Sequence, residues 1–314
     1  GLLAALLTLR LPARAGTGEP FRFDMTGLFL FAVFIGSALI TLESSRDVLT
    51  GAALWPFALL AVALLALWLL VRVERRATSP LLPIPLLKNP SIWRADALAA
   101  CHGGTIVSLL TFLPIYLRMS HGASPGTTGL LLLPFTVGIG IGALLTGRIV
   151  SRTGRTAIFP SCGMAVVAAS LIVLAFSVAG MSPTEIGWAF GFVALFMGTV
   201  MGVVQLTVQV TSGARELGAG SATVQFSRSL GAATGTALVG TVLFTTLTLR
   251  SPEAGQAFGL LLQSGPAGLQ SLTAAQQGAI MGGLEDAFRN AFLCIACFVL
   301  FALYLAWSLP LRRI

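Results

Sequence analysis

The residues of this sequence that could do chemistry are polar side chains set within long apolar segments. Arg228 is a cation in the middle of one such segment, and Gln225 lies three residues before it on the same side of a helix. Gln205 and Gln209 are four residues apart and share one face of the preceding segment. A polar group in an apolar environment is costly unless it faces protein or water. These residues are therefore candidates for a cavity lining or a gate, and hydrogen bonds between helices explain the glutamines equally well.

A histidine near the start of another apolar segment is a further candidate. His102 has the proton affinity that suits proton transfer near neutral pH, and Asp96 lies six residues before it, nearer the segment end. A separation of six residues does not bring two side chains together on a helix, so we do not predict a proton relay between them. A packed histidine is the favoured interpretation of His102, and a cavity role is the alternative.

The sequence offers no constellation typical of an enzyme. Its two histidines are far apart and its acids are scattered, whereas catalysis needs such groups clustered. Cys294 and Cys297 form a CxxC, yet no second pair or histidine accompanies them. We therefore expect no catalytic residue, no metal and no cofactor.

Composition indicates that these residues are carried by membrane-spanning helices. Of 314 residues, 56% are hydrophobic and 10% are charged, and the mean hydropathy is +0.91. Windows of about twenty apolar residues predict eight spans, and no alternation typical of a barrel strand is seen. The predicted spans are Asp24–Glu43, Ala52–Val71, Ala97–Leu117, Thr127–Ile149, Ala157–Val178, Ile186–Val208, Gly218–Leu247 and Phe288–Leu309.

The apolar segment Gly1–Leu11 is too short for a span. As a helix it would be about 16 Å long, whereas the bilayer core is roughly 30 Å thick. It has no basic leader before its apolar run, so a signal peptide is not predicted. We expect it to be the end of a truncated helix in an incomplete protein.

The positive charges predict the orientation in the cell membrane. Lys and Arg in short loops are retained in the cytoplasm, so the excess of 19 Lys and Arg over 11 Asp and Glu reflects topology rather than binding of nucleic acid. One side would carry only Arg46, Arg118, Arg250 and Arg289. The other, predicted as cytoplasmic together with the C-terminus, would carry Arg10, Arg14, Arg22, Arg72, Arg75, Arg76, Lys88, Arg94, Arg148, Arg152, Arg155, Arg215, Arg312 and Arg313.

Two further patterns concern the helices and their connections. The one long connection, Thr248–Ala287, is predicted outside, and its stretch Leu272–Leu284 is either an interfacial helix or a flexible loop. Small residues four apart predict close packing between helices, and prolines within two spans, Pro114 and Pro134, predict kinks. The small-residue pairs are Gly138 and Gly142, Gly187 and Gly191, Gly198 and Gly202, and Gly231 and Gly235.

The turn Gly147–Thr156, with the sequence GRIVSRTGRT, is the most specific local pattern. Glycines such as Gly147 and Gly154 allow a sharp turn, and Arg148, Arg152 and Arg155 hold the turn in the cytoplasm. The turn resembles the second copy of the signature loop of the major facilitator superfamily. Ser151 stands where that loop usually has an acid, so no charge relay is expected there, and a merely topological loop is the alternative.

Other stretches, in order along nearly the whole chain, resemble the fourteen-helix drug:proton antiporter branch of that superfamily. Arg118 departs from the pattern, because that branch usually has glutamine there. The resembling stretches are Asp24–Gly27, Pro80–Pro83 with Leu86–Asn89, Leu113–Leu117, Gly129–Phe135, and Gly218–Ser221 with Ser227–Gly231 and Gly235.

The resemblance implies an all-α integral membrane fold in three parts. Residues 1–23 would be the end of a truncated helix and a cytoplasmic linker, 24–94 two extra linker helices with a cytoplasmic loop, and 95–314 the C-terminal six-helix bundle with the external loop 248–287. The N-terminal six-helix bundle would be absent.

The activity implied for the intact protein is proton-coupled export of amphipathic or cationic small molecules by alternating access. Its partners would be the substrate, protons, the lipid bilayer and the N-terminal bundle. The alternatives are export of an endogenous metabolite or lipid-like compound, and a non-transporting membrane scaffold or sensor.

Overall fold

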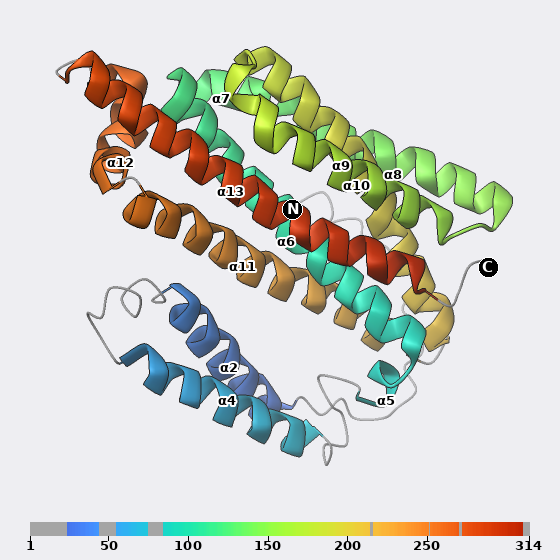
Figure 1. The fold of residues 1–314 in the computed structure, drawn as a ribbon. Coiled ribbons are helices and arrows are strands. Elements are labelled where there is room, and N and C mark those ends of the chain that lie inside the picture. The colour runs from blue at the N-terminus through green and yellow to red at the C-terminus, as the bar shows by residue number, and fades with distance from the viewer. Residues whose placement is uncertain are drawn as a thin grey trace, which may run out of the picture.

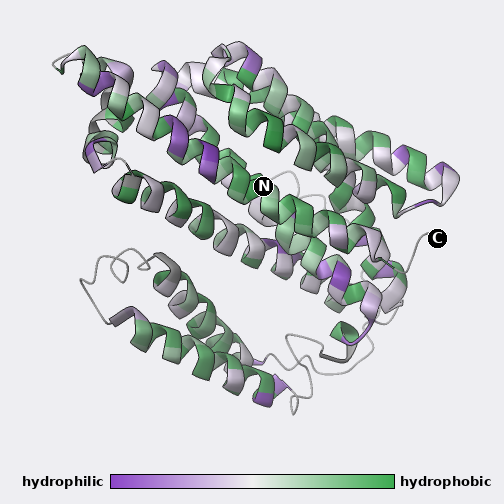
Figure 2. Ribbon diagram, viewed as in Figure 1, coloured by the Kyte–Doolittle hydropathy of each residue, from purple (hydrophilic) through white to green (hydrophobic). Residues whose placement is uncertain are grey.

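The computed structural model describes residues 24–43, 55–74, 84–213, 216–250, 252–269 and 272–309, and the elements in these ranges are helices. The long helices lie side by side (Figure 1) and are predominantly apolar along their lengths (Figure 2). Seven segments of the described chain are long and apolar enough to cross a membrane, which confirms the all-helical expectation. They are α4 (Trp55–Glu74), α6 (Pro90–His121), α7 with α8 (Pro125–Leu131 and Leu133–Thr153), α9 with η1 (Ile158–Ser177 and Val178–Gly180), α10 (Pro183–Ser212), α11 (Leu217–Arg250) and α13 (Ala274–Trp307).

The remaining predicted span is α2, Met25–Glu43, whose apolar part Met25–Thr41 is shorter than the others. It pairs with α4, and this hairpin reaches the rest of the molecule through α11 (Figure 1). The Phe31 ring of α2 meets the Phe226 ring of α11 edge to face, with 4.6 Å between the ring centroids.

Several expectations lie outside the described residues, namely those on Gly1–Leu11, on Pro80–Pro83 and on Arg10, Arg14, Arg22, Arg46, Arg75, Arg76, Arg215, Arg312 and Arg313.

Helix α6 lies at the centre of the packing, in contact with α10, α11 and α13. Helix α8 packs on α10, and α9 packs between α10 and α13. An aromatic cluster fills the interior where α6 meets α13, because the buried Tyr116 ring contacts both Phe288 and Phe292 edge to face. Burial of such rings supplies a large part of the packing contact between helices.

Local sequence signals set the helix ends. Asn89 accepts a hydrogen bond from the N–H of Ser91 and caps α6, and the preceding short helix α5 spans Ile84–Leu87. Ser182 and Glu185 form a capping box at the start of α10. Gly122, with φ of 66°, ends α6 in the left-handed conformation that glycine adopts without strain.

The connection 248–287 differs from the expectation. It contains α12 (Pro252–Ser264) and η2 (Gly265–Leu269), and α13 already begins at Ala274. The stretch Leu272–Leu284 is therefore neither a separate interfacial helix nor a flexible loop, since most of it is the first part of α13. A capping box between Thr273 and Gln276 begins this helix, and the Gln277 amide donates to the carbonyls of Leu269 and Leu272.

The two intrahelical prolines also differ from each other. Pro134 lies in the first turn of α8, directly after the break at Leu132 that separates α7 from α8. A proline there is tolerated because it lacks only an N–H that the first turn would leave unpaired. Pro114 lies inside α6, which continues through it to His121.

Candidate functional site

The loop after α8 is organised by one glycine. Gly154 has φ of 63°, and its N–H donates to the carbonyl of Val150 at 2.8 Å, so it ends α8 in the left-handed conformation. The prediction that Gly154 provides the sharp turn is confirmed. The prediction for Gly147 is wrong, because Gly147 lies within α8, one and a half turns before its end, and is open to its surroundings.

The other residues of the loop are exposed. The side chains of Arg148, Arg152 and Arg155 lie on the surface. The Ser151 hydroxyl donates to the Arg148 carbonyl at 2.8 Å, so it bonds within its own helix. The loop therefore combines a left-handed turn with a group of exposed cations, and the Ser151 hydroxyl is bonded within its own helix.

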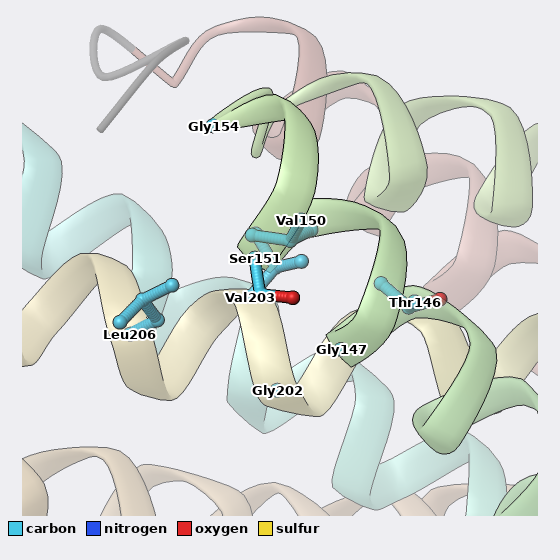
Figure 3. Close-up of a pocket in the computed structure, with 8 residues that line it drawn as sticks. All are labelled: Thr146, Gly147, Val150, Ser151, Gly154, Gly202, Val203 and Leu206. Atoms are coloured by element: carbon cyan, nitrogen blue, oxygen red, sulfur yellow. The ribbon is translucent and has the colours of Figure 1, made fainter.

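A cavity of about 300 Å³ lies between this loop and α10. Figure 3 shows Gly147, Val150 and Ser151 of α8 beside Gly202 and Val203 of α10. Helices α8 and α10 run parallel and touch backbone to backbone nearer their starts, where Gly142 lies against the Leu195 carbonyl. At Gly202 nothing lies within 4 Å of the position of a Cβ atom, so the helices diverge there and leave the cavity.

Small residues also bring α6 and α11 together along what we call the α6–α11 seam, formed by Ala100, Gly103 and Gly104 of α6 with Arg228, Gly231 and Gly235 of α11. Gly231 lies against the backbone of Ala100, and Gly235 against the Cα atom of Gly104. The predicted packing role is confirmed for Gly231 and Gly235 and for the pairs Gly138 and Gly142, and Gly187 and Gly191. In the remaining pair, Gly198 packs on α8 and Gly202 does not.

Arg228 is half-buried on this seam, where its backbone carbonyl and its Cγ atom lie against Gly103. The ion pair found among the described residues joins Asp286 to Arg289 on α13, so Arg228 has no acidic partner in that part of the chain. Gln225, grouped with Arg228 by its spacing, is exposed. Of these two residues, which the sequence places on the same side of a helix, Arg228 thus lies on the seam and Gln225 on the surface.

The two glutamines of α10 are both half-buried. The Gln209 amide donates to the Ser221 hydroxyl of α11 at 3.4 Å, which is the link between helices that was one of the two interpretations. Gln209 lies near the end of α10, and Ser221 lies near the start of α11.

His102 is buried, with 3% of its surface exposed, and its Nε2 lies 3.0 Å from the Met197 carbonyl of α10. Its Nδ1 has no hydrogen-bond partner. The favoured interpretation of a packed histidine is confirmed for position and burial, although only one of the two ring nitrogens is bonded. Gly103, the next residue of α6, lies against Arg228 of α11. His102 and Arg228, both candidates from the sequence, therefore lie near adjoining sides of α6.

Asp96 was not expected to take part, yet it is buried and meets Thr223 of α11. A signal was available in the sequence. Asp96 precedes Ala100, Gly103 and Gly104 by four, seven and eight residues, which places it on the same helix face as these small residues.

Comparison with known proteins identifies the family. The family model described as Major Facilitator Superfamily matches residues 23–236. An uncharacterised MFS-type transporter of Mycobacterium tuberculosis is 30% identical over 90% of this chain and 41% of its own length. The multidrug transporter protein MdtP of Bacillus subtilis is 27% identical over 77% of this chain and 45% of its own length, and the multidrug resistance protein Stp of M. tuberculosis is 27% identical over 79% and 46%.

The chain thus spans less than half the length of these relatives. A solved structure agrees in fold, namely a bacterial homolog of the human lysosomal transporter Spinster in an inward-facing, unoccupied conformation. It aligns with a TM-score of 0.55 and 16% identity, over 91% of this chain and 69% of the other. On the match of the family model, which covers well over half of the residues, this chain belongs to the Major Facilitator Superfamily of membrane transporters.

Proposed function

We propose that this chain is the C-terminal part of a proton-coupled exporter of amphipathic or cationic small molecules. The observation that carries the proposal is the similarity, over more than three quarters of the chain, to transporters named for multidrug transport and resistance. Residues 1–23 would end a preceding helix, 24–94 would form the linker helices, and 95–314 would form the C-terminal bundle of a fourteen-helix protein. An N-terminal bundle would complete it.

The close packing of α6 on α11 and of α8 on α10 would let this part of the chain move as one body in a rocking mechanism. The α8–α10 and α6–α11 contacts are made through glycine backbones, which present smooth surfaces to one another. In alternating access, one bundle rocks against the other around a central site. The half-buried Arg228 and the buried His102 would lie near the substrate path as a gating residue and a packed support respectively.

Export of a lipid-like or endogenous compound is a second candidate. It is favoured by a cavity of about 670 Å³ between α2, α6 and α11, where none of the described residues that line it is charged. Apolar side chains such as Leu39, Val107 and Phe112 line it together with the hydroxyls of Ser229, Thr236 and Thr241. A neutral, elongated ligand suits such a lining better than a cation does.

Transport by the full-length protein tests the proposal. The full-length protein, meaning the longer protein to which we assign this chain, is reconstituted in vesicles, and movement of a cationic dye is followed with an imposed proton gradient. Dye movement that stops when the gradient is dissipated is expected. A neutral fluorescent lipid measured in the same vesicles distinguishes the second candidate. Failure to move either compound would contradict both and favour a non-transporting scaffold.

A further inference from the structure

Asp96 is a buried acid at the start of the α6–α11 seam. Only 4% of its surface is exposed, and it lies within α6, about two turns after Pro90. Its Oδ2 atom has no hydrogen-bond partner. A charged carboxylate in such a position loses its hydration and is not compensated, which makes the ionised form costly.

The hydrogen bonds of the Thr223 hydroxyl indicate that the Asp96 carboxyl group carries a proton. Its Oγ1 lies 2.8 Å from the Gly220 carbonyl of the same helix and 3.4 Å from Asp96 Oδ1. A hydroxyl carries one hydrogen, and the shorter contact to Gly220 uses it. An ionised Asp96 has to share this one hydrogen with the Gly220 carbonyl over the longer contact, whereas a protonated Asp96 can donate a hydrogen of its own to the Thr223 oxygen. The geometry thus fits a chain from the Asp96 carboxylic acid through Thr223 to the Gly220 carbonyl.

Among the described residues, the other charged groups on the helices around Asp96 are occupied, exposed or distant. Glu216, directly before α11, is exposed, and Arg118 and His121 lie in the last turn of α6. On α6 itself, the Arg94 guanidinium donates to the Ser308 carbonyl beyond the end of α13, and His102 turns toward Met197 of α10. The charged residue of α10 is Glu185, in the capping box at its far end. Those of α13 are Glu285, Asp286 and Arg289, in its first half, and those of α11 are Arg228, two turns further along the seam, and Arg250 at its end.

We propose that Asp96 is a proton-binding site of this transporter and that the packing of the α6–α11 seam depends on whether Asp96 carries its proton. When the proton leaves, the Thr223 hydroxyl rotates from the Gly220 carbonyl to Asp96 Oδ1, and a negative charge arises between two helices that touch through their backbones. Arg228 is the cation on that seam that can respond to the charge. The proposal deepens the proposed function, because it assigns the coupling proton to a residue of the C-terminal bundle.

Infrared spectroscopy of the purified full-length protein tests whether Asp96 binds a proton. The carbonyl stretch of a protonated carboxylic acid is followed during titration with and without the dye substrate. We expect a band that is lost in Asp96→Asn and shifts in Thr223→Val, which keeps the shape of threonine but removes its hydroxyl. Asp286→Asn, which removes a half-buried acid of α13 that pairs with Arg289, is the matched control and keeps the band.

Transport by the same variants tests coupling. Asp96→Asn imitates the protonated acid, so we expect at least a tenfold loss of gradient-driven dye efflux while dye exchange without a gradient is retained. Wild-type efflux by Asp96→Asn, or a band that survives this substitution, would overturn the proposal. If Asp96→Asn does not fold, an unshifted band in Thr223→Val overturns it instead. If the wild-type protein moves no dye, the proposed function fails, and the infrared titration still decides whether Asp96 binds a proton.

Discussion

Among single residues, Gly154 has the most restrictive conformation of the loop after α8. Its positive φ belongs to a region that costs other residues roughly 1–2 kcal/mol, and more for a β-branched side chain. We expect Gly154→Val in the full-length protein to lower the unfolding temperature and to impair transport. Ser151→Ala should have little effect, because the Ser151 hydroxyl is exposed and bonds only to the Arg148 carbonyl of the same helix. Thermal unfolding in detergent and dye efflux would measure both, and the reverse result would mean that the Ser151 hydroxyl matters and the turn at Gly154 does not.

Arg228 gives a second prediction at this scale. A charge within a span costs about 2.5–3.5 kcal/mol on insertion scales, so its retention on the seam requires compensation by function or by structure. If Arg228 acts in gating, Arg228→Gln should abolish gradient-driven efflux at normal membrane abundance, and Arg228→Lys should restore part of it. Gln225→Ala, at an exposed position one turn away, is the control and should transport normally.

Abundance of these variants separates the two roles of Arg228. Loss of protein from the membrane in parallel with loss of efflux would indicate a structural anchor between α6 and α11. Full efflux by an abundant Arg228→Gln protein would exclude the gating role.

At the residue scale, the sequence predicts conformations better than it predicts contacts. The turn at Gly154 follows from local pattern alone, because a glycine followed by a base after a helix is typical of a left-handed end. The contact between Asp96 and Thr223 joins residues 127 positions apart. It depends on which helix lies beside α6 and on how both are rotated, and neither property is encoded in local spacing.

Among the helices, the glycine seams set which pairs approach most closely. Spacing of four residues correctly identifies Gly142 and Gly231 as interface positions, yet it identifies Gly202 just as strongly, where α8 and α10 have already diverged. The spacing shows which face of a helix carries small residues. Whether a second helix packs closely on that face depends on the angle and the position at which the two helices cross, and the sequence of one helix does not determine these.

Two glycines of α8 allow a matched test of this seam. A Cβ atom at Gly142 would meet the Leu195 carbonyl of α10, whereas nothing lies within 4 Å of such an atom at Gly140. We expect Gly142→Ala to destabilise the protein by about 1–3 kcal/mol, the typical cost of overpacking. Gly140→Ala should leave stability unchanged or raise it by up to about 1 kcal/mol through better helix propensity. Unfolding in detergent would measure the difference, and equal stabilities would mean that α8 and α10 do not touch at Gly142.

Helix ends show where hydropathy fails as a guide. The predicted last span begins at Phe288, because Glu285 and Asp286 interrupt the apolar window before it, yet α13 begins at Ala274. A helix does not need an apolar sequence throughout, and part of its length can lie outside the bilayer. The pattern Thr273-x-x-Gln276 is a capping box and was the signal in the sequence for the true start.

For the whole molecule, the number and the order of the long helices follow from composition, whereas their arrangement does not. Windows of twenty apolar residues locate every long helix of the described chain, because a bilayer leaves a chain of this composition almost no alternative to helices. The central position of α6 and the parallel α6–α11 and α8–α10 pairs come from packing between distant segments.

The orientation of this bundle in the membrane is the last prediction. Positive charge in short loops predicts that the segment around Lys88 faces the cytoplasm and that the segment around Ala275, beyond an odd number of spans, faces the other side. Both side chains are exposed, so a cysteine at either position is accessible to a reagent without disturbing a cap or a buried contact. The native Cys101, Cys162, Cys294 and Cys297 are free and are first replaced by alanine in the full-length protein.

In intact cells, an impermeant maleimide should label Ala275→Cys and leave Lys88→Cys unlabelled until the membrane is opened. Labelling of both positions from outside would show that the number of spans between them is even, and labelling of Lys88→Cys alone would invert the bundle and place the arginines of the loop after α8 outside the cell.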